Sequence, residues 1–380
     1  NIKFFVDWGD GSALETVVPD AQTSPVTIDH VFVDNQAGLT TISVIAEDDK
    51  GNYPAVTKDI TVANVAPELT SLTAAEESGF AIVIEGDTVA LTGDITDVGV
   101  LDSFTLNVDW GDGSTIEDFT LAARSADFNV VHPYVNDGNY TINVTLADDD
   151  GDSTVMTTTI VVENAAPVLT YTVAPIEVEE GSAVSLSGTV ADLGVEDSHT
   201  VEVTWGDGSS ENVPVVGDTF TATHTYADDN PTATSADDLT VTVTVTDTTD
   251  PTSSVSSDTT ITVLNVAPSI VTIATDAETI DTEVAIGETV TLTTTFEDPA
   301  GVSDGYTIVI DWGDDTTSSS TGSYDSLTGI GTITTTHEYA SEGIFDVIVE
   351  VTDDDTGTSE SRSTIALVGT FSNLSPATPP

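Results

Sequence analysis

The sequence predicts an all-β protein made of tandem Ig-like β-sandwich domains. Apolar residues alternate with Thr, Asp or Asn along most of the chain, a period that is typical of antiparallel sheets buried on one face. The segment Trp-Gly-Asp-Gly, or a close variant, occurs four times. Its tryptophans stand at 8, 110, 205 and 312, so the copies are about one hundred residues apart, a spacing that fits one small domain per copy.

The four copies divide the chain into repeats and a tail. We predict repeat 1 at residues 1–63, repeat 2 at 64–165, repeat 3 at 166–266, repeat 4 at 267–368, and a Pro- and Thr-rich tail or linker at 369–380. Repeat 1 opens at the strand that carries Trp8, so we expect its first strands to be missing. They are expected either from preceding residues of the natural chain or from a neighbouring molecule.

Within each complete repeat the alternation predicts about seven short strands and no helix, which is typical of two packed sheets. Repeat 2 shows the pattern in three runs: Val89, Leu91 and Ile95; Phe104, Leu106, Val108 and Trp110; Tyr140, Ile142, Val144 and Leu146. Repeats 3 and 4 contain corresponding runs. The linkers between repeats share Asn and Pro: Asn64-Val-Ala-Pro67, Asn164-Ala-Ala-Pro167 and Asn265-Val-Ala-Pro268. Because proline fixes φ, we expect these linkers to hold successive repeats stiffly, nearly end to end.

The charge balance limits the classes of partner. The chain has 66 acidic residues against 5 basic ones, a net charge of -61. This balance argues against nucleic acid and against anionic membranes, since both require Lys and Arg. It favours divalent cations, above all Ca²⁺, which binds carboxylate and carbonyl oxygens. No apolar stretch approaches the length of a transmembrane helix, so no membrane insertion is expected within this segment.

The recurring Trp and His residues have a structural and a functional interpretation. Trp-Gly-Asp-Gly could form a carbohydrate platform or an acidic catalyst, but a core Trp followed by a tight turn is the favoured interpretation. Four histidines recur in register: His30, His132, His224 and His337. We expect a structural role, with each imidazole bonded to backbone near a strand end and the aromatic side chain two residues later in the core. His199 lies outside this pattern.

Acidic residues cluster at two places in the repeats, and these clusters are the candidate metal sites. One set brackets Gly99, Gly194 or Gly301 before the Trp strand, and the other follows a long apolar strand. Oxygen-only clusters with a glycine suit Ca²⁺ better than zinc or copper, although their spacing is not that of an EF-hand. The alternative is a hydrophilic turn whose carboxylates face water. The candidate Ca²⁺ ligands are Asp97, Asp102, Asp148, Asp149, Asp150, Asp192, Asp197, Asp298, Asp304, Asp353, Asp354 and Asp355.

These motifs together resemble the polycystic-kidney-disease (PKD) domain family. Repeat 2 carries the full pattern: Trp110 to Gly113, His132 to Tyr134, Gly138 to Tyr140, and the Asp-rich turn Asp148 to Gly151. Repeat 4 replaces Gly113 with Asp315, repeat 3 has an insertion at 229–238, and repeat 1 is looser. The resemblance implies an Ig-like sandwich, usually extracellular, that binds Ca²⁺ in some members, and it implies no catalysis.

The function predicted from these features is structural or adhesive. We expect an extended string of PKD-like domains stiffened by Ca²⁺, part of a microbial surface protein or extracellular filament, without enzymatic activity. The expected partners are neighbouring copies, other surface proteins or glycans. The alternative is a spacer or carbohydrate-binding region of a secreted hydrolase whose catalytic domain lies outside this segment.

Overall fold

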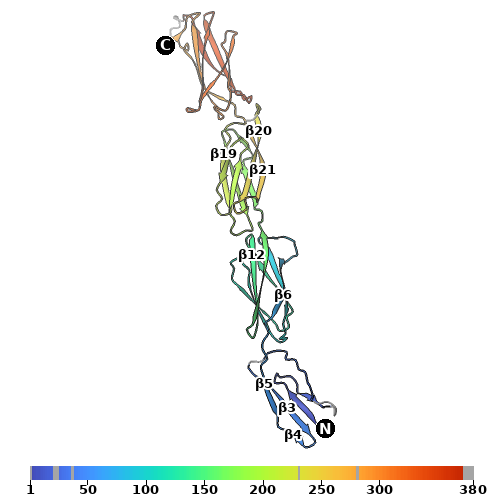
Figure 1. Cartoon of the computed structure of the whole chain (residues 1–380). Coiled ribbons are helices and arrows are strands. Elements are labelled where there is room, and N and C mark those ends of the chain that lie inside the picture. Colours follow the sequence, from blue (N-terminus) through green and yellow to red (C-terminus); the bar gives the residue numbers. More distant parts are fainter. Residues whose placement is uncertain (1, 20–24, 36–37, 230–231, 280–281, 371–380) are drawn as a thin grey trace, which may run out of the picture. The chain divides into compact units, whose positions relative to one another are not determined.

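The computed structural model describes residues 2–19, 25–35, 38–229, 232–279 and 282–370. The elements in these residues are β-strands arranged in several sheets, which confirms the all-β fold class (Figure 1). Within the described ranges, no helix is long and apolar enough to cross a membrane. Contacts divide the chain into two compact units, Asn1–Ala165 with Leu193–Glu196 and Ala166–Asp192 with Asp197–Pro380.

Repeat 1 forms a single antiparallel sheet in the first unit. Its strands are β1 (Lys3–Asp7), β2 (Glu15–Val17), β3 (Thr40–Asp48), β4 (Gly51–Asn52) and β5 (Val56–Ile60). The strand order is β2-β1-β3-β4, and β5 also pairs with β3, beside which Figure 1 shows it. The apolar face of this sheet lines a groove of about 510 Å³ between Trp8, Val26 and Val44.

Repeat 2 is a two-sheet sandwich. Its strands are β6 (Glu68–Glu76), β7 (Val83–Ile84), β8 (Thr88–Thr96), β9 (Phe104–Asp109), β10 (Glu117–Leu121), β11 (Asp127–Pro133), β12 (Gly138–Asp148) and β13 (Ser153–Glu163). One sheet has the order β10-β9-β12-β13-β7 and the other has β11-β8-β6. The alternating apolar residues of both sheets, Leu91, Val108 and Val144 among them, are fully buried between them.

Repeat 3 has the same two-sheet plan in the second unit. Its strands are β14 (Val168–Ala174), β15 (Glu177–Glu179), β16 (Ala183–Ala191), β17 (His199–Thr204), β18 (Ser210–Val213), β19 (Thr219–Thr225), β20 (Ala236–Asp247) and β21 (Ser254–Leu264). The sheets have the orders β14-β16-β19 and β15-β21-β20-β17-β18. The three labelled strands β19, β20 and β21 mark this repeat in Figure 1.

Repeat 4 completes the second unit. Its strands are β22 (Ser269–Thr275), β23 (Thr289–Glu297), β24 (Thr307–Asp311), β25 (Thr317–Thr321), β26 (Ser323–Asp325), β27 (Ile330–Glu338), β28 (Gly343–Thr352) and β29 (Arg362–Val368). The sheets have the orders β22-β23-β27-β26 and β25-β24-β28-β29. Its core again gathers the Trp, the Tyr two residues after the recurring His, and aliphatic residues from both sheets.

In repeats 2, 3 and 4 the recurring aromatic residues lie in the core, as predicted, whereas Trp8 and Phe32 of repeat 1 are half-buried. Trp110, Trp205 and Trp312 are at most 1% exposed. The Tyr hydroxyl of each complete repeat donates a hydrogen bond to the carbonyl of its Trp: Tyr134 to Trp110 at 2.8 Å, Tyr226 to Trp205 at 2.9 Å and Tyr339 to Trp312 at 3.0 Å. The bond satisfies a phenol that would otherwise be buried without a partner, so Trp and Tyr fix the distance between the two sheets.

An early strand and the last strand of repeats 2 and 3 meet in parallel, although all other pairs in these repeats are antiparallel. The short β7 pairs with β13 through Val83↔Val162, and β15 pairs with β21 through Val178↔Val263. The Glu180 amide extends the second pair by donating to the carbonyl of Leu264 at 3.0 Å. In each of these repeats, the pairing joins a strand near the start of the domain to its last strand.

The register of β9 and β12 determines where the acidic segments meet. Asp148, the last residue of β12, pairs with Phe104, the first residue of β9. The loop 97–103, which enters β9, therefore lies beside the turn 148–152, which leaves β12. In repeat 4, Thr352 pairs with Thr307 and brings the corresponding loop and turn together. The two acidic sets found separately in the sequence thus share one end of the sandwich.

Candidate metal centres

The loop between β8 and β9 turns one buried carboxylate inward. The Gly99 amide donates to Asp97 Oδ1 at 3.0 Å, and the Asp102 amide donates to the Gly99 carbonyl at 3.1 Å, which curls the loop. Asp102 is only 2% exposed. A Cβ at position 99 would lie 2.3 Å from Asp102 Oδ2, so glycine is required for this close approach. The sequence-based role of Gly99, a loop that can curl, therefore has a specific steric basis.

The acidic turn after β12 is held by its own first carboxylate. Asp148 Oδ1 accepts hydrogen bonds from the amides of Asp150, Gly151 and Asp152 at 3.1, 2.7 and 2.9 Å. The next residue, Asp149, accepts the Ser103 amide through Oδ1 at 3.1 Å and ties the turn to the loop. One carboxylate oxygen each of Asp97, Asp102 and Asp148 lies within 4.8 Å of the other two.

Repeat 1 adds one carboxylate to this end of repeat 2. Asp34 follows the recurring His30 segment, and its carboxylate lies within 4.8 Å of one oxygen each from Asp102 and Asp150. The linker residue Asn64 donates through Nδ2 to Asp148 Oδ2 at 2.7 Å. Carboxylates from two successive repeats therefore converge, and we call this group of residues the repeat 1–2 junction.

Repeat 4 builds the same loop and turn. Asp298 Oδ1 accepts the Ala300 amide at 3.0 Å, and Asp354 accepts the Gly305 amide through Oδ1 at 2.5 Å. In the turn, Asp353 Oδ1 accepts the Gly357 amide at 2.6 Å. Asp304 takes the place of Asp102 and is 8% exposed. Repeats 2 and 4 thus both place acidic residues in this loop and in the facing turn, although the loop of repeat 4 is one residue longer.

Repeat 3 supplies the facing half of the second group, which we call the repeat 3–4 junction. Glu180 Oε1 accepts the amide of Val266 in the linker at 2.9 Å. One oxygen of Glu180 lies within 4.8 Å of oxygens of Asp298 and Asp304, and one lies equally near Asp228 and Asp229. The linker again takes part, because Asn265 donates through Nδ2 to Asp353 Oδ2 at 3.1 Å.

Several of these buried oxygens have no hydrogen-bond partner. The atoms are both Oδ atoms of Asp102, Asp229 and Asp304, the Oδ2 atoms of Asp97 and Asp298, and Oε2 of Glu180. Asp229 is 0% exposed and Glu180 is 2% exposed. Burying a carboxylate without a partner is costly, so these oxygens point to a positively charged ligand.

Burial of the junction carboxylates also raises their pKa values, because the charged form loses its contact with water. Burial and, after it, the neighbouring Asp34 carboxylate raise the pKa of Asp102 to about 7. At the repeat 3–4 junction burial is again the main cause, with adjacent carboxylates adding to it. It raises the pKa of Glu180 and of Asp304 to about 8, of Asp229 to about 7 and of Asp298 to about 6. A divalent cation would reverse these shifts by favouring the charged forms.

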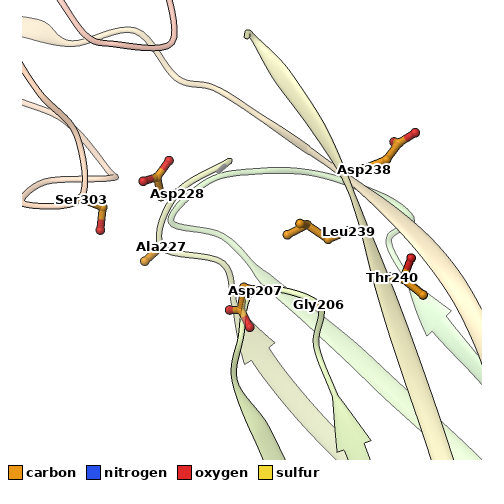
Figure 2. Close-up of a pocket in the computed structure, with 8 residues that line it drawn as sticks. All are labelled: Gly206, Asp207, Ala227, Asp228, Asp238, Leu239, Thr240 and Ser303. Atoms are coloured by element: carbon orange, nitrogen blue, oxygen red, sulfur yellow. The ribbon is translucent and has the colours of Figure 1, made fainter. Parts of the chain in front are cut away.

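A groove of about 670 Å³ gives access to the repeat 3–4 junction. Figure 2 shows Asp228 and Ser303, which belong to repeats 3 and 4, facing this groove, with Asp207 and Gly206 on an adjoining segment. Since Asp228 belongs both to the groove lining and to the carboxylate group, the groove offers an entry path for a hydrated ion.

The acidic residues of repeat 3 have different surroundings. Asp192 Oδ2 lies 2.8 Å from His199 Nε2, which gives that isolated histidine a partner. The Thr249 hydroxyl, which has one proton to donate, lies 2.9 Å from Asp197 Oδ1 and 2.6 Å from Asp247 Oδ1. Thr248 and Thr249 stand where repeats 2 and 4 have aspartates. The loop before the Trp strand has the same length in repeats 2 and 3, but in repeat 3 side chains of the protein contact its carboxylates.

The expected backbone bond of the recurring histidines is wrong. Each Nε2 instead meets the Asp of its Trp-Gly-Asp segment: His30 with Asp10 at 2.6 Å, His132 with Asp112 at 2.8 Å, His224 with Asp207 at 2.7 Å and His337 with Asp314 at 2.8 Å. Each imidazole also stacks on its Trp with ring centroids 4.5 to 4.8 Å apart. The role is structural, as expected, but a carboxylate is the partner.

Sequence reasoning placed ligands on only one side of each junction. It missed Asp34, Glu180, Asp228 and Asp229, which come from the preceding repeat. Asp34, Asp228 and Asp229 follow the recurring His-x-aromatic step by two or three residues, and this common offset was the available signal. Nothing local marked Glu180, because it directly follows β15, where the exposed Glu177 and Glu179 are of the same residue type.

Residues 70–163 match the family model of the PKD domain. A search of the curated proteins finds no match. Among solved structures, the chain is similar to a crystal structure of a tetra-tandem repeat in the extending region of a large adhesion protein. The identity is 18% and the TM-score 0.49, with 96% of this chain and 91% of that chain covered.

Two further structures give more distant similarity. The PKD domain of an M14-like peptidase from Thermoplasmatales archaeon SCGC AB-540-F20 is 21% identical, with a TM-score of 0.22, and 28% of this chain and 98% of that chain are covered. A structure concerned with host cell surface retention of a 1.5-MDa bacterial ice-binding adhesin is 17% identical, with a TM-score of 0.29 and coverage of 81% and 100%.

Proposed function

Because residues 70–163 of this chain belong to the PKD domain family, we propose that the protein is a structural, adhesive component of the cell surface or extracellular space. In this proposal Ca²⁺ binds at the junctions between repeats and stiffens a string of PKD-like domains. The observation that carries the proposal is the convergence of buried, unpartnered carboxylate oxygens from two successive repeats.

The ligand chemistry favours calcium. The converging groups are carboxylates, and Ca²⁺ takes six to eight oxygen ligands at about 2.3–2.6 Å. Two oxygens on opposite sides of one Ca²⁺ are then about 4.6–5.2 Å apart. The separations within 4.8 Å in these groups fit that geometry. Backbone carbonyls and water would complete the coordination shell.

The scarcity of basic residues explains why a cation would matter mechanically. After Lys58 the sequence contains only Arg124 and Arg362, whose side chains donate to the carbonyls of Val100 and Val271. Carboxylates of adjoining repeats therefore repel each other unless a cation lies between them. A bound Ca²⁺ replaces this repulsion with attraction and would hold the two repeats together.

The surface location and the partners are part of the same proposal. Extracellular Ca²⁺ modules work with dissociation constants of about 10⁻⁴–10⁻³ M, a range that suits partly exposed junctions such as these. The partners we propose are neighbouring copies of the chain, other surface proteins or glycans. A net charge of -61 keeps such a protein soluble and works against binding to anionic surfaces.

Chelation tests the proposal directly. Melting by calorimetry and dimensions by small-angle X-ray scattering are measured for the chain with excess EDTA, with Ca²⁺ and with Mg²⁺. We expect Ca²⁺ to raise Tm. In the scattering data, Ca²⁺ should increase the maximum dimension of the chain and reduce the spread of its conformations. Mg²⁺ should act weakly, because it prefers a smaller octahedral shell and retains its water. Identical melting and dimensions with EDTA and with Ca²⁺ would overturn the proposal.

A further inference from the structure

At each of these junctions, two groups of described carboxylates overlap. At the repeat 1–2 junction the groups are Asp97, Asp102 and Asp148, and Asp34, Asp102 and Asp150. At the repeat 3–4 junction they are Glu180, Asp228 and Asp229, and Glu180, Asp298 and Asp304. In both junctions a single residue, Asp102 or Glu180, belongs to both groups.

From this overlap we infer that each of these junctions binds two Ca²⁺ ions that share one buried carboxylate. One ion is held by residues of a single repeat, and the other is held by residues of both repeats. The inference deepens the proposed function, on which it rests, by assigning the number of ions and the residues that hold each one.

The shared residues have the free oxygens that such bridging requires. Asp102 is 2% exposed and neither of its Oδ atoms accepts a hydrogen bond, so one oxygen is available to each ion. Glu180 uses Oε1 for the Val266 amide, whereas its Oε2 has no partner. Carboxylate oxygens have two lone-pair sites each, so Oε1 can also contact an ion.

The outer members of the groups also aim unpartnered oxygens at the proposed ions. Asp229, in the single-repeat group, is 0% exposed and has two unpartnered Oδ atoms. Asp304, in the group that spans both repeats, has two as well and is 8% exposed. Each group at this junction therefore has its own buried carboxylate with two unpartnered oxygens, and an ion in each group would give both carboxylates a partner.

Charge supports the same count. The two groups at the repeat 1–2 junction contain five different carboxylates. One Ca²⁺ would leave three negative charges uncompensated, whereas two leave one. At the repeat 3–4 junction the groups again contain five carboxylates, with Asp353 and Asp355 buried close by. Because like charges repel strongly where water is excluded, the second ion is favoured by the charge that the first leaves.

In this arrangement the two ions have different roles: one orders a loop within a single repeat, and the other joins two repeats. Repeat 2 alone supplies Asp97, Asp102 and Asp148, so its ion can bind whether or not repeat 1 is in place. That ion would fix Asp102 and thereby prepare the second group, which also needs Asp34 of repeat 1. Repeat 3 supplies the corresponding single-repeat group with Glu180. The ion that joins the repeats is thus added to a site that the first ion has ordered.

Native mass spectrometry of the full chain can count the ions. At saturating Ca²⁺, Asp34→Asn and Asp97→Asn should each lose one bound ion relative to the unmodified chain. The double variant D34N/D97N should lose two, since each change removes a different ion. Asp127→Asn is the matched control in repeat 2: this carboxylate is exposed on β11, and the variant should keep every ion.

The double variant keeps the proposal falsifiable without a change to Asp102. If one ion occupies the junction, D34N, D97N and D34N/D97N all lose the same single ion, and the inference is wrong while calcium stiffening stands. If none of the variants loses an ion and chelation leaves melting unchanged, the proposed function fails as well. Asp102→Asn, checked for an intact fold by circular dichroism, should lose two ions by itself.

Discussion

Repeats 2 and 3 build the same loop before the Trp strand and the same turn after the long strand, but they satisfy its carboxylates differently. In repeat 3 the Thr249 hydroxyl contacts both Asp197 and Asp247, and His199 contacts Asp192. In repeat 2 neither oxygen of Asp102 has a hydrogen-bond partner. Thr249 and His199 thus contact carboxylates of repeat 3, whereas no described group donates a hydrogen bond to the Asp102 carboxylate of repeat 2.

The difference shows that the backbone path of this loop and the contacts of its carboxylates are set by different residues. Gly99 in repeat 2 and Gly194 in repeat 3 preserve the loop length, and the strand register brings loop and turn together in both repeats. The neighbouring side chains then differ: one oxygen each of Asp197 and Asp247 lies within hydrogen-bond distance of the Thr249 hydroxyl, whereas neither oxygen of Asp102 has such a contact. Repeat 4 follows repeat 2, with unpartnered oxygens on Asp298 and Asp304.

The largest expected effect is a reversal of the pH dependence on Ca²⁺ removal. The raised pKa values of Glu180 and Asp304, about 8, and of Asp102 and Asp229, about 7, lie above the ordinary carboxyl values. The folded chain without Ca²⁺ therefore binds more protons than the unfolded chain between pH 4 and 8. Its free energy of unfolding should rise as the pH falls through this window.

With saturating Ca²⁺ the trend should be opposite, because protons compete with the ion for the same oxygens. Melting curves from pH 8 to pH 5, recorded with EDTA and with Ca²⁺, test this. A shift of about 10 °C or more in each direction is expected, since the four raised pKa values together contribute several kcal/mol and about 1 kcal/mol moves the Tm of a small domain by about 4 °C. Parallel pH profiles with and without Ca²⁺ would contradict the prediction.

The next effect compares Asp304→Asn with Asp197→Asn. Removal of the Asp304 charge should eliminate most of the Ca²⁺-dependent stabilisation of repeat 4, about 2.7 kcal/mol per ion at 100 times Kd. The same variant should melt higher than the unmodified chain in EDTA, because a buried repulsion is relieved. Asp197→Asn should cost only about 1 kcal/mol, the contribution of one hydrogen bond. Calorimetry with and without Ca²⁺ gives both values, and equal Ca²⁺ effects for the two variants would refute the comparison.

A third change moves repeat 3 towards repeat 2. Thr249→Asp removes the hydroxyl bonds to Asp197 and Asp247 and adds a negative charge. In EDTA we expect a loss of about 1–3 kcal/mol, and Ca²⁺ should restore much of it. Thr249→Val is the matched control, since it removes the hydroxyl without adding a ligand. Recovery of both variants by Ca²⁺, or of neither, would show that the carboxylate count does not decide the response.

The smallest effect concerns the linker asparagines. Asn64 donates to two carboxylates, Asp148 at 2.7 Å and Asp152 at 3.1 Å, whereas Asn265 contacts one carboxylate, Asp353 at 3.1 Å, and one more distant carbonyl. Hydrogen bonds to charged groups contribute about 1.5–3 kcal/mol and others about 1. Asn64→Ala should therefore lower stability more than Asn265→Ala in chemical denaturation. The reverse order would contradict this ranking.

The sequence was sufficient for the fold but for only half of each junction. Alternation predicts the strands because one face of each sheet is buried, and the Trp and Tyr positions follow from the same period. The candidate ligands Asp102 and Asp304 could be identified because acidic residues recur around a glycine. Glu180 and Asp34 were not, since no sequence period reports which end of one repeat faces the next. The His–Asp contacts were missed for a related reason: they join residues 17 to 23 positions apart across the sandwich.

The parallel pairing of β15 with β21 has a mechanical consequence. Tension applied to the two ends of repeat 3 pulls β15 backward along its axis and β21 forward. The hydrogen bonds between these strands, including Glu180 to Leu264 and Thr262 to Ile176, lie across the direction of the pull. They must therefore shear together instead of opening one after another as in a peeled hairpin. The early strand that closes the sandwich is also a clamp against stretching.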